Sequence, residues 1–95
     1  MSNLYKEREQ GQAAERILKD AIWVDAWTAY RARILEEIEA APSNGHEYVM
    51  HLKRLLAAAS AAKAHLERIM AEGAVAAGTI EFEDKKKSGI RRLFG

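Results

Sequence analysis

With 95 residues, of which 48% are apolar, the chain is long enough for one small domain and too apolar to be disordered throughout. It contains no cysteine, which excludes disulfides, thiolate metal sites and cysteine nucleophiles. The formal net charge of +1 gives the whole molecule no strong field toward nucleic acid or membranes. Because alanine supplies much of the apolar fraction and buries little area, we expect a thin core that oligomerisation would support.

The sequence shows neither a membrane span nor a secretion signal. No run approaches the roughly 20 apolar residues that cross a bilayer. The first ten residues are polar and charged, without the apolar centre of a signal peptide. We therefore expect an intracellular protein with no membrane partner.

Residues 4–19 are predicted to form the first helix. Glu, Gln, Ala, Arg and Lys dominate the segment, and Ala14, Ile17 and Leu18 give it an apolar edge. Gly11 weakens its centre by ~1 kcal/mol relative to alanine.

Residues 21–40 are predicted to form the second helix, with Asp20 as its N-cap. A continuous helix with a bend at Asp20 stays open as an alternative. An apolar stripe at helical spacing is interpreted as core, and its members are Trp23, Trp27, Tyr30, Ile34 and Ile38. The last turn is acidic, which is unfavourable at the negative end of the helix dipole. This acidity at Glu36, Glu37 and Glu39 suggests a basic partner.

A turn at residues 41–45, containing Pro42, separates the second helix from a third that we expect over residues 45–72. Asn44 and Glu47 fit a capping box, and Gly73 fits a C-cap. The short turn makes the second and third helices antiparallel neighbours. At 1.5 Å per residue the third helix would span ~42 Å against ~30 Å for the second, so its far end needs another partner.

The third helix carries a seven-residue apolar repeat. It runs at steps of four and three through Tyr48, Leu52, Leu55, Ala59, Ala62, Leu66, Ile69 and Gly73. Its alanine-rich middle would let two helices approach closely, as in a coiled coil of two copies. The predicted oligomer or partner contacts are Leu52, Leu55, Ala59, Ala62, Leu66, Ile69 and Met70. The last three are expected to meet the first helix or another subunit.

Residues 74–95 are predicted to form a C-terminal arm, extended or partly helical, after a helical domain over residues 1–73. Basic and apolar side chains crowd its end: Lys85, Lys86, Lys87, Ile90, Arg91, Arg92, Leu93 and Phe94. The three apolar residues, spaced three and four apart, suggest a one-turn anchor for a partner protein. The cations leave open contact with phosphates of a nucleic acid.

No catalytic, metal or cofactor site is predicted. His51 follows Glu47 by one helical turn, but two ligands do not make a metal site. Ser60 stands in an alanine run, where we interpret it as a small packing residue or an exposed hydroxyl, and no glycine-rich phosphate loop follows a strand. We therefore expect no enzyme activity and no cofactor.

Several features recur along the chain in a fixed order: the run Glu15–Asp20, an amphipathic helix through Trp27, a turn with Pro42, and then Leu52, Leu55, Leu56, His65, Leu66, Glu67 and Gly73. This pattern resembles a set of small helical proteins of tailed bacteriophages. Similar proteins are often encoded among capsid and DNA-packaging genes. The resemblance covers residues 12–78, with Ala21 and Ala74 where that set has proline and lysine. It implies a phage origin and localisation in the host cytoplasm or the virion, and it carries over no functional residues.

The expected fold is all-α: an antiparallel helical pair with the first helix packed beside it. The leading hypothesis for function is a structural or assembly protein that works by protein–protein contact, as a homo-oligomer or on a larger phage protein. Two alternatives stay open. One is a nucleic-acid-binding packaging or regulatory accessory that uses the basic tail, and the other is a small inhibitor of a host protein.

Overall fold

The computed structural model describes the backbone of residues 3–94 and the side chains of residues 3–89. This part of the chain is all-α, with three helices: α1 (Leu4–Lys19), α2 (Ala21–Ala40) and α3 (His46–Phe94). The predicted bounds of the first two helices are confirmed.

Side-chain caps define where α1 and α2 begin. The carboxamide oxygen of Asn3 accepts the backbone N–H groups of Tyr5 and Lys6 at 3.0 and 3.2 Å. The Asp20 carboxylate accepts those of Ile22 and Trp23 at 2.9 and 3.1 Å. These bonds satisfy N–H groups that a helix start leaves without a partner. Asp20 itself is extended, with φ −64° and ψ 128°, so the chain breaks there into two helices.

The third helix is much longer than predicted, and the expected end near Glu72 with a cap at Gly73 is wrong. α3 has 49 residues, about 73 Å at 1.5 Å per residue. Gly73 lacks the positive φ that a C-cap glycine adopts. Ala76 and Ile80 are buried just beyond it. Packing of this segment on α1 therefore favours continued helix where the sequence alone was ambiguous.

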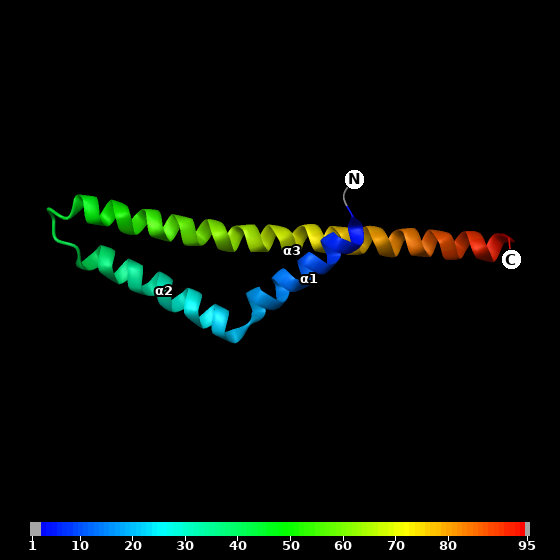
Figure 1. The fold of residues 1–95 in the computed structure, drawn as a ribbon, viewed down its shortest axis with the longest axis horizontal. Helices are drawn as coiled ribbons and strands as arrows, with labels where there is room; N and C mark the ends of the chain where they lie inside the picture. The colour runs from blue at the N-terminus through cyan, green and yellow to red at the C-terminus, as the bar shows by residue number, and fades with distance from the viewer. Residues whose placement is uncertain (1–2, 95) are drawn as a thin grey trace.

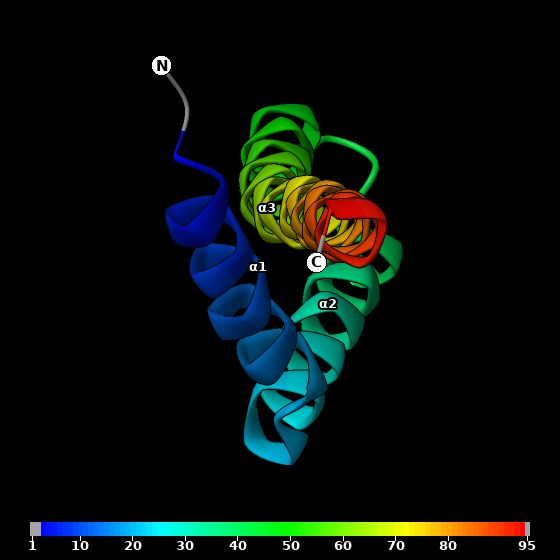
Figure 2. The same ribbon diagram turned by 90° about the vertical axis from the view of Figure 1, so that its right-hand side faces the viewer.

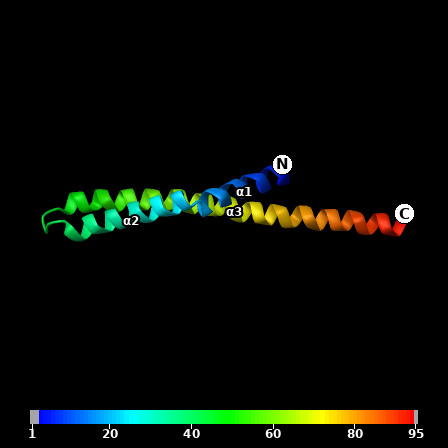
Figure 3. The ribbon, with the colours of Figure 1, turned by 90° about the horizontal axis from the view of Figure 1, so that it is seen from below.

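The helices form an elongated molecule of 77 × 27 × 15 Å. Both α1 and α2 run opposite to α3 and meet in an elbow at Asp20 that lies away from it (Figure 1). Seen along the length of α3, α2 lies below it, and α1 starts beside it and slants down to the elbow (Figure 2). The last turns of α3 project past the start of α1 (Figure 3).

The helices α1 and α3 pack closely at a pair of glycines. A Cβ placed on Gly11 would lie 2.6 Å from the Gly73 Cα and 3.2 Å from the Ile69 carbonyl oxygen. Only hydrogen side chains allow the two backbones to come this near. Within one chain the close approach thus lies here and not at the predicted alanine waist, where Ala62 is exposed.

The core is thin. Among residues 3–89, five apolar side chains are buried: Ala14, Ile34, Leu52, Ala76 and Ile80. The predicted aromatic core is only partly formed, since Trp23 and Trp27 are half-buried and Tyr30 is 43% exposed. The radius of gyration is 21.3 Å, against about 12 Å for a compact chain of this length. Much apolar surface therefore remains in contact with solvent.

Candidate functional site

One face of α3, here called the inner face, packs against α1 and α2. It is made by two series with seven-residue spacing, and every member is buried or half-buried. The first series is Leu52, Ala59, Leu66, Gly73 and Ile80, and the second is Val49, Leu56, Lys63, Met70 and Ala77. The sustained seven-residue period is typical of helices that pack along their length.

The predicted contact residues divide between this face and solvent. Leu52 is buried, and Ala59, Leu66, Ile69 and Met70 are half-buried within the chain, whereas Leu55 is 37% exposed and Ala62 is exposed. Ile69 and Met70 lie at the α1 crossing. The Ile69 carbonyl is close to Gly11, and Met70 lines a groove with Gly11 and Glu15. The far end of the predicted repeat, at Ile69 and Met70, therefore meets α1.

The opposite side of α3, here called the outer face, was missed by the sequence analysis. A step of two residues turns about 200° around an α-helix, so residues two places after the first inner series point to the far side of α3. Together with residues three and four positions away they form a second repeat, all exposed. Its members are Glu47, Met50, Arg54, Ala57, Ala61, Ala64, Arg68, Ala71, Val75, Gly78, Phe82 and Lys85.

Among the described residues of α3's second half, the large apolar side chains that are exposed lie on the outer face. Val75 is 71% exposed and Phe82 68% exposed, and Met50 lies at the other end at 37%. A Cβ added to Gly78 would meet no atom within 4 Å. The signal that could have revealed this face was a second four-and-three spacing, hidden because alanines populate both repeats.

A groove opens between α2 and α3, near the elbow where α1 meets α2. Its volume is about 520 Å³, and it is lined mainly by α2 residues, with Leu18 of α1 and Lys63 of α3. Trp23 and Trp27 stack there with centroids 6.4 Å apart, and the Lys63 ammonium lies 5.3 Å from the Trp27 ring centroid. The cation over an aromatic face explains why an inner position of α3 holds a lysine.

The acidic end of α2 has a structural use that the sequence analysis did not find. The Tyr48 hydroxyl donates a hydrogen bond of 3.0 Å to Glu37, and the Arg33 guanidinium lies 3.6 Å from the same carboxylate. The hydrogen bond to Glu37, with some burial, raises the pKa of Tyr48 above its ordinary value. Glu37 thus links α2 to the start of α3, whereas Glu36 and Glu39 are exposed.

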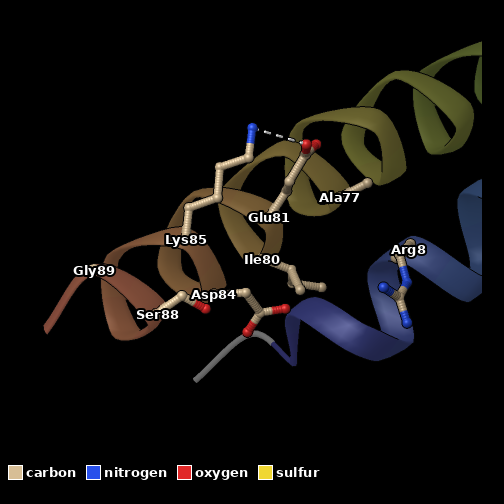
Figure 4. Close-up of a pocket in the computed structure, with 8 residues that line it drawn as sticks. All are labelled: Arg8, Ala77, Ile80, Glu81, Asp84, Lys85, Ser88 and Gly89. Atoms are coloured by element: carbon tan, nitrogen blue, oxygen red, sulfur yellow. Dashed lines mark ion pairs between the residues drawn. The ribbon is translucent and has the colours of Figure 1, made fainter. Parts of the chain in front are cut away.

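A second groove, of about 790 Å³, lies where the end of α3 passes the start of α1 (Figure 4). Ile80 and Asp84 project from α3 toward α1, while Lys85 extends along α3 to Glu81, 3.3 Å away. Arg8 of α1 stands over the Tyr5 ring at 5.3 Å. Charges of both signs border this groove, so it presents no uniformly basic surface.

The basic tail is helical, and its lysines are separated around the helix. Lys85, Lys86 and Lys87 are all exposed, but consecutive residues differ by about 100° in direction. The geometry therefore gathers no row of cations along a phosphate backbone from these three. The side chains predicted to act with them lie outside the described residues: Ile90, Arg91, Arg92, Leu93 and Phe94.

The histidines are exposed, and His65 Nδ1 lies 3.1 Å from the Arg68 guanidinium. Across the described residues, no group of three or more His, Cys, Asp or Glu side chains could hold a metal ion. Among the helices of that same part of the chain, none combines the length and apolar character needed to cross a membrane. Comparison with protein families, curated proteins and solved structures finds no match to this chain.

Proposed function

We propose that this chain is a helical assembly protein that acts by protein–protein contact, without catalysis of its own, and that its bundle is completed by further helices from other molecules. The observation that carries this proposal is the amount of apolar helix surface that the chain leaves uncovered. Single exposed apolar residues are ordinary, but a contiguous face of them marks an interaction site.

The accessible surface supports the proposal quantitatively. The chain exposes 7655 Å², whereas a compact protein of this size exposes about 5,500 Å². The surplus of about 2,200 Å² exceeds the roughly 800 Å² per partner of a standard protein interface. Since the described part of the chain buries five apolar side chains, an isolated molecule has little hydrophobic stabilisation, and association would supply much of its stability.

Size-exclusion chromatography with light scattering, together with sedimentation at several concentrations, tests the proposal. We expect an oligomer whose thermal stability rises with protein concentration, because association favours the folded state. A stable monomer at every concentration that binds no component of its source's assemblies would refute the proposal.

The phage setting rests on the sequence resemblance. The resemblance implies a structural or assembly setting, for which a helical contact module is a suitable architecture. Mass spectrometry of purified virions tests this setting. Detection at a fixed copy number would support a structural role, and detection only in infected-cell lysate would favour a transient assembly role.

A further inference from the structure

We infer that the outer face of α3 pairs with the same face of a second copy, in antiparallel orientation, to form a two-fold symmetric dimer. This inference rests on the proposed function and identifies the partner and the surface. The outer face from Glu47 to Lys85 covers 38 residue steps, about 57 Å of helix. That length of pairing, together with the surplus surface, is what a stable dimer needs.

The outer face is free to accept a helix. In Figure 2, α2 lies below α3, and α1 starts beside α3 before it slants down to the elbow. The members of the outer face are exposed, and only at its edge do Ala71 and Val75 line a groove with Glu7 of α1. Between Ala57 and Ala71 the face carries small side chains apart from Arg68, so a second helix can approach closely along its centre.

The charges on the face favour the antiparallel orientation. In a parallel pair each residue meets its own counterpart, so Arg54 would face Arg54 and Arg68 would face Arg68 at the centre of the interface. Like charges placed together there are unfavourable, and burying them adds a desolvation cost. In an antiparallel pair, arginines can instead oppose small residues of the second copy.

One antiparallel register satisfies the whole face. In this register the residue numbers of two facing residues, one from each copy, add up to 132. The pairs are Glu47 with Lys85, Met50 with Phe82, Arg54 with Gly78, and Arg68 with Ala64. Opposite charges meet at the ends, a thioether meets an aromatic ring, and both arginines oppose small residues. Each favourable pair occurs twice because of the two-fold axis.

The neighbouring registers are less favourable. Sliding one copy by seven residues in one direction sets Arg54 against Lys85, two like charges. Sliding it by seven in the other direction moves Phe82 opposite Ser43, which precedes α3, and leaves the ring uncovered. The register that sums to 132 avoids both faults.

Cysteine cross-linking tests the inference directly, because the chain has no cysteine of its own. Ala61 of one copy should face Ala71 of the other. We expect a mixture of Ala61→Cys and Ala71→Cys chains, oxidised under mild conditions, to form the mixed disulfide in preference to either homodimer. The matched control is Ala58→Cys with Ala74→Cys, two exposed alanines whose numbers also add to 132 but which flank the seam on opposite sides.

The outcomes separate the inference from the proposed function. If Ala61→Cys alone links to itself as readily as to Ala71→Cys, the orientation is parallel and the inference is wrong. If the protein is a dimer by light scattering but the test pair links no better than the control pair, the inference fails and the proposed function stands. A protein that stays monomeric at every concentration overturns the inference. The proposed function would then stand if the monomer binds other assembly components, and would fail if it binds none.

A surface variant gives a second readout. Phe82→Lys should weaken dimerisation on the order of tenfold or more, because it replaces the largest apolar contact of the face. Ile22→Lys removes a side chain that is 79% exposed on α2, away from this face, and should leave the dimer unchanged. Equal effects of the two variants would contradict the inference.

Discussion

Gly11 of α1 and Gly73 of α3 meet so closely that a Cβ placed on Gly73 would lie 2.5 Å from the Gly11 Cα and 2.9 Å from the Glu7 carbonyl oxygen. Both obstacles are backbone atoms, which cannot move aside as a flexible side chain can. We therefore expect Gly73→Ala to destabilise the protein by about 1–3 kcal/mol, as overpacking does. Thermal and urea unfolding followed by circular dichroism measure this loss.

Gly78→Ala is the matched control for that substitution. Gly78 belongs to the same helix, but an added Cβ meets no atom within 4 Å. Alanine should raise stability there by up to ~1 kcal/mol through its better helix propensity. If both variants gain stability, the helices do not cross at the glycine pair.

The contact between α2 and the start of α3 depends on Ile34 and Leu52, which are 4% and 3% exposed. Each truncation to alanine should cost about 2–4 kcal/mol, the usual range for removing a buried aliphatic side chain. Ile22→Ala, at a position 79% exposed, should change stability by less than about 0.5 kcal/mol. Denaturant unfolding at one fixed protein concentration compares the three. Equal losses at Ile22 and Ile34 would show that α2 packs by a different face.

The elbow between α1 and α2 depends on the Asp20 cap. Asp20→Ala removes the acceptor for the Ile22 and Trp23 N–H groups and should cost about 1 kcal/mol. Asp20→Asn keeps an oxygen in the same place and should retain most of that stability. Urea unfolding distinguishes them, and an asparagine variant as unstable as the alanine variant would argue against the cap.

The hydrogen bond from Tyr48 to Glu37 predicts a pH dependence. Because it raises the pKa of Tyr48 above the ordinary 10.0, its stabilisation is present below pH 10 and is lost as pH rises through the folded-state pKa. Tyr48→Phe should therefore lower stability at neutral pH, and this difference from the parent should vanish in strong alkali.

Subtracting the phenolate absorbance titration of Tyr48→Phe from that of the parent isolates the pKa of Tyr48. Glu37→Gln should bring this pKa back toward 10.0, because the charged acceptor is gone. An unchanged value in Glu37→Gln would exclude the hydrogen bond as the cause.

The sequence by itself determined the local structure of the first half of the chain. Asp20 and Pro42 divide it at points set by short-range chemistry, a carboxylate that caps and a ring that cannot continue a helix, and the predicted bounds of α1 and α2 are those of the structure. Such signals depend on neighbours within a few residues, so the sequence displays them directly.

Only the tertiary structure decided how far α3 extends and which of its faces are covered. Gly73 is a helix stop by propensity, yet here it allows a crossing with Gly11, a residue 62 positions earlier. Of the predicted seven-residue repeat, the series Leu52, Ala59, Leu66 and Gly73 lies on the inner face, whereas Tyr48, Leu55 and Ala62 are exposed. Alanines serve both the inner and the outer repeat, so spacing could not assign faces. The packing of α1 and α2 on α3 makes that assignment, and it leaves Val75 and Phe82 71% and 68% exposed.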